Sequence, residues 1–267
     1  MKNILLLVHD DDGQEGRLQI ALDLTRALGG HLSCLDVVVP PVVVPEYYPG
    51  PGQLAPLMAA RELEAENMGR VRRRLEVEDV AWDIQQVTGD PAHWLEKAAA
   101  LADVIVVSSR SERPEIDEAV RRIVDELAVK SERLVLAVPP GSTQLDVAGR
   151  ALIAWDDSHE ANQVLRAAVP LLQLAGQVTL IEVNRAGGEF AAQDAATYLA
   201  RHRVQALVVQ ETTTDTVAEA LLAHARDTRA SYIVMGAFGH SRAIEAIFGG
   251  TTSSVLRNSE IPIFLHH

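Results

Sequence analysis

A glycine-containing segment near the C-terminus has the residue types that hold phosphate groups. Gly236 and Gly239 follow the short apolar run 232–235, where they would let the backbone approach a ligand closely. Nine residues then separate Gly239 from Gly249. This spacing can bring two glycine turns to one ligand, and backbone N–H groups in such turns favour an anion.

The residues after Gly249 predict a helix that begins with hydroxyl groups. Gly250 precedes Thr251 and Thr252, and the pattern becomes helical by 254–257. The N–H groups of a first helical turn have no partner within the helix and attract anions, while threonine hydroxyls donate to phosphate oxygens. His240 directly follows the second glycine, where it can touch a phosphate or be an ordinary exposed loop histidine.

The length of the chain is explained by an internal repeat. Residues 8–37 match residues 154–183 without gaps at a shift of 146, and residues 102–132 match residues 230–260 at a shift of 128. The first half therefore carries 18 extra residues, which we place in segment 40–56. Its six prolines predict a loop, because proline forbids helix and interior strand.

Both halves alternate short apolar runs with longer segments of helical period, which predicts βα units around a parallel sheet. We therefore expect an α/β protein with two similar doubly wound, Rossmann-like domains in tandem, residues 1–142 and 143–267, with the boundary at 139–143. The predicted strands are 3–9, 31–38, 81–87, 104–108, 134–138, 151–155, 178–183, 206–210, 232–235 and 261–265. The predicted helices are 15–28, 58–75, 91–101, 114–129, 160–174, 190–202, 216–228 and 252–257.

In a doubly wound sheet, ligands bind beyond the carboxyl ends of the strands, where the winding reverses. Asp156 follows the first predicted strand of the second half, and Val183 closes the second. The Asp156 carboxylate can accept hydrogen bonds from a ribose or an adenine amino group, and the Val183 backbone can pair with a base edge. Capping of the helix that begins near Glu160 is an equally good reading of Asp156.

Each half resembles a universal stress protein domain, and the whole chain resembles a tandem member of that family. Gly236, Gly239 and Gly249 keep the glycine spacing of its nucleotide-binding members, but Gly250 replaces the usual Ser, Thr or Asn. Thr251, one position later, can substitute. The resemblance implies that the second domain binds ATP, with or without Mg²⁺, in a stress response, and that Asp156 and the Val183 backbone contact the nucleoside.

The first half departs from this pattern. At the shift of 128 the four glycines correspond to Ser108, Ser111, Arg121 and Arg122, so we expect no phosphate cradle there. Arg121 and Arg122 are expected to form exposed ion pairs with Glu118 and Asp125 on their own helix rather than to hold another anion.

Charge and composition limit the partners. The net charge is −13 and neither half is basic, which argues against nucleic acid and anionic membranes. No apolar stretch reaches the roughly 20 residues of a bilayer span, and Cys34 is the only cysteine, so we expect a cytoplasmic protein. No residue set has metal-ligand spacing or a nucleophile motif.

We therefore expect an adenine nucleotide and an unidentified protein as partners. The resemblance implies that the two domains form an intramolecular pseudo-dimer that imitates a family dimer, with strands 134–138 and 261–265 near its pseudo-twofold axis. Whether two chains form a further homodimer is left open by the sequence. A nucleotide-responsive regulator is the favoured function. A ligand-free scaffold and a weak ATPase are the alternatives, because no side chain is a convincing catalytic base.

Overall fold

Each repeat forms five strands with helices on both faces of the sheet. The computed structural model describes residues 1–39, 55–184, 191–239 and 250–267. The first repeat contains β1 (Asn3–Val8), α1 (Gln14–Leu28), β2 (His31–Val38), α2 (Ala55–Leu75), β3 (Ala81–Thr88), α3 (Pro91–Ala98), β4 (Val104–Ser108), α4 (Pro114–Lys130) and β5 (Leu134–Val138). The second contains β6 (Arg150–Ala154), α5 (His159–Ala167), α6 (Val169–Leu172), β7 (Gln177–Val183), α7 (Ala192–Arg201), β8 (Ala206–Glu211), α8 (Val217–Thr228), β9 (Tyr232–Gly236), α10 (Thr251–Asn258) and β10 (Ile263–His266).

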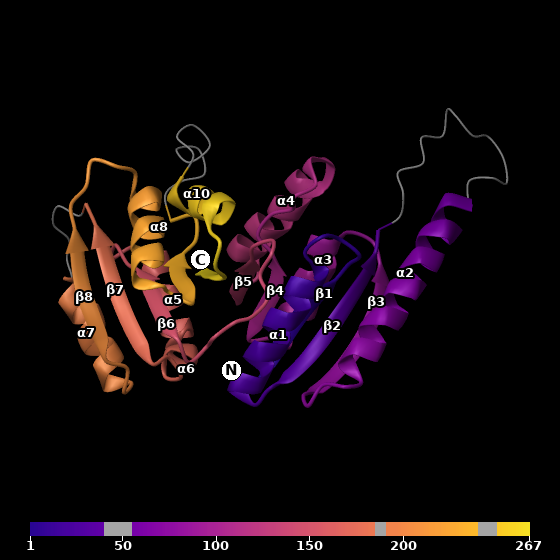
Figure 1. Ribbon diagram of the computed structural model, residues 1–267, viewed down its shortest axis with the longest axis horizontal. Helices are drawn as coiled ribbons and strands as arrows, with labels where there is room; N and C mark the ends of the chain where they lie inside the picture. Colours follow the sequence, from indigo (N-terminus) through magenta and orange to yellow (C-terminus); the bar gives the residue numbers. More distant parts are fainter. Residues whose placement is uncertain (40–54, 185–190, 240–249) are drawn as a thin grey trace.

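The strands make one ten-stranded sheet in the order β3-β2-β1-β4-β5-β10-β9-β6-β7-β8 (Figure 1). Neighbouring strands are parallel except β5 and β10, which pair antiparallel with Phe264 opposite Leu136. The last strands of the two repeats thus meet, as predicted. The strand order reverses between β1 and β4 and again between β6 and β9, so each repeat has its own switch point for a ligand.

Both faces of the sheet are buried, because successive strand residues point to opposite sides. Ile4 and Leu6 pack on one side with α1, α2, α5 and α7. Leu5 and Leu7 pack on the other with α3, α4, α8 and α10. Each of these two hydrophobic clusters contains residues of both repeats.

The structure corrects three details of the predicted elements. The predicted helix 160–174 breaks at Ala168 into α5 and α6, since Pro170 has no N–H to continue the ladder. The last strand begins at Ile263 rather than at residue 261. Most of the predicted loop 40–56 lies outside the described residues, but Ala55 and Pro56 begin α2, where a first-turn proline is tolerated.

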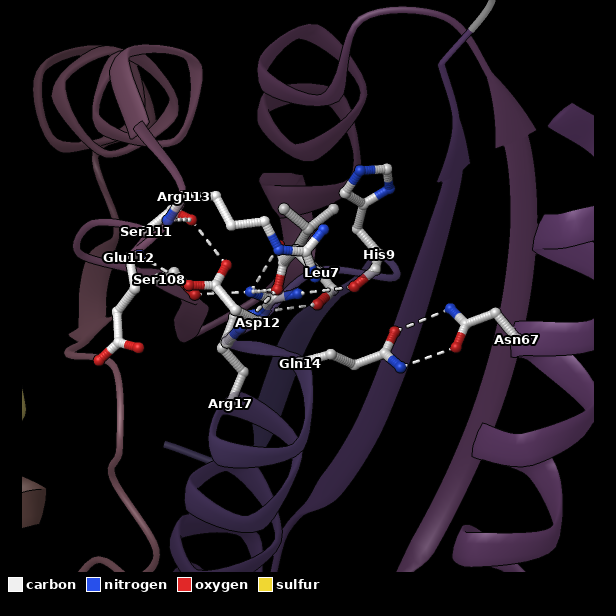
Figure 2. Close-up of polar contacts among 12 residues, drawn as sticks. Leu7, His9, Asp12, Gln14, Arg17, Asn67, Ser108, Ser111, Glu112 and Arg113 are labelled. Atoms are coloured by element: carbon white, nitrogen blue, oxygen red, sulfur yellow. Dashed lines mark hydrogen bonds and ion pairs between the residues drawn. The ribbon is translucent and has the colours of Figure 1, made fainter. Parts of the chain in front are cut away.

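A buried arginine fills the end of the first repeat's sheet (Figure 2). Arg17, on α1, is 1% exposed, and each of its three guanidinium nitrogens donates a hydrogen bond. Nε donates to Leu7 O (3.2 Å) and Nη2 to His9 O (3.1 Å). Nη1 donates to both Asp11 carboxylate oxygens (2.7 and 2.9 Å) and to Ser108 Oγ (2.5 Å). The guanidinium thereby joins β1, the turn after it and β4.

Two buried carboxyl groups lie between β2 and α2. Asp36 is 0% exposed and accepts a hydrogen bond from Gln86 Nε2 (2.6 Å), while Glu64 is 7% exposed and accepts one from Asn67 Nδ2 (3.2 Å). Burial, together with the hydrogen bond and charge of Asp36, raises the pKa of Glu64 from 4.5 to about 7. Burial also raises the pKa of Asp36. The pair therefore holds a proton in the folded protein at a pH where the unfolded chain has lost it.

No helix within the described ranges is long and apolar enough to cross a membrane.

Replacing Arg17 by Gln, the residue at the equivalent position 163, should lower the free energy of unfolding by about 3–5 kcal/mol, because the buried Asp11 carboxylate loses its countercharge. Urea unfolding measures the loss. Arg26→Gln on the same helix is the control, and it should cost much less because Arg26 forms its ion pairs at the surface. Equal losses in the two variants would contradict the role assigned to Arg17.

The free energy of unfolding should fall by about 1–3 kcal/mol as the pH rises from 5 to 8 on account of Glu64, because its raised pKa means that the folded state binds more protons than the unfolded state in this range. In urea titrations at both pH values, the free energy of unfolding of Glu64→Gln should depend less on pH than that of the wild type. Glu62→Gln, an exposed change on the same helix, should keep the wild-type slope. An identical slope in all three proteins would show that the pair does not titrate as stated.

Candidate functional site

The second repeat has a cavity of about 350 Å³ at its switch point. It lies at the carboxyl ends of β6, β7 and β9 and at the start of α10. Six of the residues predicted from the sequence line it: Asp156, Val183, Gly236, Gly239, Thr251 and Thr252. Gly250 is the N-cap of α10. The two other predicted residues, His240 and Gly249, lie outside the described residues.

The turn after β6 presents Asp156 to solvent. Asp156 is exposed, and its Oδ1 accepts a hydrogen bond from Ser158 N (3.1 Å). Asp157 adopts a left-handed conformation with φ of 65°, which reverses the chain toward α5. Ser158 is the N-cap of α5, because its hydroxyl accepts from Ala161 N (3.1 Å). Helix capping therefore does not need the Asp156 carboxylate, which stays at the cavity wall.

Gly236 ends β9 and Gly239 lies in the turn after it. Neither glycine is needed for an unusual backbone conformation; what matters is the room that a side chain would take up. Neither Gly236 nor Gly239 has a positive φ; the left-handed residue of this turn is Phe238, with φ of 55°. A Cβ atom on Gly236 would lie 2.7 Å from Ala161 N, so α5 can begin only against a glycine. A Cβ atom on Gly239 would lie 2.6 Å from Glu160 Oε2, the movable end of a side chain. Packing alone thus accounts for Gly236, whereas Gly239 leaves its backbone open at the cavity.

Helix α10 points its start at the same cavity. No described side chain caps it, and its first turn carries no acidic residue, so the positive end of the helix faces the site. Thr252 is 4% exposed and its Oγ1 accepts a hydrogen bond from Phe238 N (3.3 Å). This bond ties the glycine turn to the helix, and the Thr251 side chain lines the space between them.

The other end of α10 is held by the first repeat. Arg110 Nη1, which follows β4, donates to Ser259 O (2.8 Å) and lies 3.5 Å from Leu256 O. A cation at the carboxyl end of a helix complements its dipole. The first domain therefore helps to fix the helix whose opposite end faces the cavity.

An apolar wall completes the cavity, and sequence reasoning did not identify it. Its members are Ala154, Ile181, Val217, Leu221 and Met235. Val217 and Leu221 are spaced i, i+4 just after the N-cap Thr216, whose capping box with Glu219 fixes the start of α8. This i, i+4 spacing at the start of a helix was the sequence signal that could have identified the apolar wall. Glu160 also lines the cavity, so two carboxylates, Asp156 and Glu160, border the space.

The equivalent positions in the first repeat are built differently. Ser108, in place of Gly236, accepts from Arg17, and Ser111, in place of Gly239, donates to Asp12 Oδ1 (2.6 Å) (Figure 2). Arg121 and Arg122 form ion pairs as expected, but with acidic partners that the sequence did not predict. Arg121 pairs with Asp117 (3.1 Å), and Arg122 pairs with Glu126 (3.2 Å) on its own helix and with Asp90 (2.9 Å) at the start of α3.

No cluster of three or more His, Cys, Asp or Glu side chains suited to a metal ion occurs in the part of the chain that the structure describes. The two carboxylates at the second-repeat cavity are therefore too few to make a metal site of protein groups alone.

Comparisons with known proteins agree with this architecture. The model of the universal stress protein family matches residues 1–140 and again residues 148–267. A universal stress protein from Archaeoglobus fulgidus DSM 4304 is similar over 99% of this chain and 96% of its own, with 19% identity and a TM-score of 0.77. A putative universal stress protein from Pseudomonas aeruginosa UCBPP-PA14 covers 100% and 93%, with 16% identity and a TM-score of 0.58. No curated protein matches the sequence significantly.

The two family matches together span nearly all of the sequence, and each corresponds to one five-stranded half of the sheet. This agrees with the internal repeat and with the two switch points. The chain belongs to the universal stress protein family, with two such domains in tandem.

Proposed function

We propose that the second domain binds an adenine nucleotide, with ATP as the preferred ligand, in a nucleotide-responsive stress protein. The observation that carries this proposal is the convergence of three features on one cavity of about 350 Å³ at a switch point: the uncapped start of α10, the open backbone of Gly239 and an apolar wall. These features suit a ligand with an anionic end and a flat apolar end.

The arrangement gives each part of the nucleotide a separate place. The adenine ring lies against the apolar wall, with the Val183 backbone at its edge, and Asp156 accepts hydrogen bonds from the ribose hydroxyls. The phosphates lie between Gly239 and the first turn of α10, where N–H groups and the Thr251 hydroxyl donate to them. Gly250 does not weaken this anchor greatly, because the helix start supplies backbone donors whatever its N-cap residue.

The negative charge at the cavity favours binding of ATP together with Mg²⁺. Asp156 and Glu160 both line the cavity, and their carboxylates would repel an uncompensated triphosphate. Mg²⁺ in nucleotide sites usually takes one or two carboxylates together with phosphate oxygens and water. Asp156 and Glu160 can supply these carboxylate ligands, and the ion would neutralise the negative charge that they share with the phosphates.

ATP at 100 times its dissociation constant should stabilise the protein by about 2.7 kcal/mol, which corresponds to a rise in Tm of about 5–10 °C for a chain of this size. Gly239→Val should reduce the affinity for ATP at least tenfold in titration calorimetry and lower the stabilisation at the same ATP concentration to about 1.4 kcal/mol or less, because its side chain narrows the cavity. Gly69→Val, the same change on α2 of the first domain, is the control and should bind ATP as the wild type does. Unaltered ATP binding in Gly239→Val would refute the placement of the phosphates.

Gly236 is unsuitable for this test, because any side chain there meets the backbone of α5 and would disturb folding itself.

Glu160→Gln should increase the affinity for ATP measured without Mg²⁺ severalfold and reduce the gain in affinity that Mg²⁺ produces in the wild type, because one repelling carboxylate is removed. Adenosine, which carries no phosphate, should bind both proteins equally. Titration calorimetry with and without Mg²⁺ separates these cases. A parallel change in the affinities for adenosine and ATP would show that Glu160 does not face the phosphates.

A further inference from the structure

The first domain has a cavity of its own at the equivalent switch point. Its volume is about 460 Å³, and it lies between the ends of β1 and β4, the start of α3 and one face of α4. By the two shifts of the repeat, four of its lining positions coincide with lining positions of the second-domain cavity: His9 with Trp155, Val107 with Met235, Ser108 with Gly236, and Ile123 with Thr251. The two cavities therefore occupy the same place in two copies of one fold.

The first-domain cavity lacks the features that suit phosphate. Helix α4 begins at Pro114, so the position equivalent to the start of α10, Ile123, falls inside α4, where backbone N–H groups are bonded within the helix. The helix turns an apolar face to the cavity through Ile116, Ala119, Val120 and Ile123, which follow the i, i+3, i+4, i+7 spacing. An aliphatic wall thus stands where the second domain offers the donors of a helix start.

The charged groups around this cavity already balance one another. Arg17 donates to Asp11 and, as Figure 2 shows, to Ser108 and the carbonyl groups of Leu7 and His9. At the cavity rim Arg122 pairs with Asp90. The hydrogen bond that Arg122 donates to Asp90 (2.9 Å) and the charge of that carboxylate raise the pKa of Arg122, so the rim pair stays ionised. An anionic ligand would have to displace Asp11 or Asp90 from its arginine, which disfavours it.

One lining residue has a polar atom without a partner. His9 Nδ1 is buried and has no hydrogen-bond partner among the described residues. A buried polar atom without a partner is costly, so a ligand that supplies one hydrogen bond at this point gains from doing so.

We propose that the first domain binds an uncharged, largely apolar small molecule with a single hydrogen-bonding group directed at His9, and that the two domains of this chain therefore take ligands of different chemical classes. The apolar lining, the internally neutralised charges and the free His9 Nδ1 select this class and exclude nucleotides. This inference does not rest on nucleotide binding by the second domain.

The test uses N-phenyl-1-naphthylamine, an uncharged aromatic amine whose fluorescence rises in apolar sites. The full-length protein should bind it saturably, and Ala119→Phe, which fills the cavity from α4, should weaken binding at least tenfold. Ala81→Phe is the matched control, an exposed position at the opposite end of the sheet, and should bind as the wild type does. The anionic analogue 1-anilinonaphthalene-8-sulfonate should bind the wild type at least tenfold more weakly.

Absence of saturable binding by the wild type, or equal binding by Ala119→Phe and the wild type, would overturn the proposal. Backbone NMR of the wild type with the same probe locates the site even if a variant folds poorly. Shifts confined to the amides of Val107, Ala119 and Ile123 support the inference, and shifts at Val217 and Thr251 instead would overturn it. Neither the fluorescence nor the NMR measurement depends on ATP, so these results do not change if the second domain fails to bind a nucleotide.

Discussion

The antiparallel pairing of β5 with β10 is the contact on which the architecture depends. Ala137, Leu136 and Val135 lie opposite Ile263, Phe264 and Leu265, and all six residues are fully buried. Without this pairing each half would expose an apolar strand edge, which is an aggregation hazard. With it, α4 of the first domain and α10 of the second lie on the same face of the sheet (Figure 1). Residues of both helices line one groove. Arg110 can therefore reach the end of α10, and the helix that borders the second-domain cavity is held in part by the first domain.

The two domains have the same topology, but different side chains and a different helix start surround the switch point in each. In the second domain the chain leaves space there, since Gly239 has no side chain and α10 begins at the cavity. In the first domain Ser108 and Arg17 fill the end of the sheet with a neutralised polar network, and α4 begins early enough to cover the site with aliphatic side chains. The same topology can thus present a positive helix end or an apolar wall, depending on where one helix begins. This difference is the physical basis for assigning different ligands to the two halves.

Much of the fold could be predicted from the sequence, because the repeat and the apolar periodicity define the strands and their order in each half. The resemblance to a family dimer placed 134–138 and 261–265 near the pseudo-twofold axis, where they do meet. The spacing of the glycines, together with Asp156 and Val183, selected residues that do line one cavity. The position of Arg17 could not be predicted, since its bond to Ser108 joins residues 91 apart in sequence. Neither could the contact of Glu160 with the glycine turn, which depends on the path of the backbone into α5. The family resemblance pointed to a nucleotide as the ligand of the glycine segment, but it did not indicate that Gly236 is also needed for packing.

We propose that one chain carries a single nucleotide site, located in the second domain. Native mass spectrometry of the full-length protein with excess ATP counts bound nucleotides directly. We expect one nucleotide per chain, and still one when the first-domain cavity is filled by Ala119→Phe. Two nucleotides per chain, or none at saturating ATP, would contradict it.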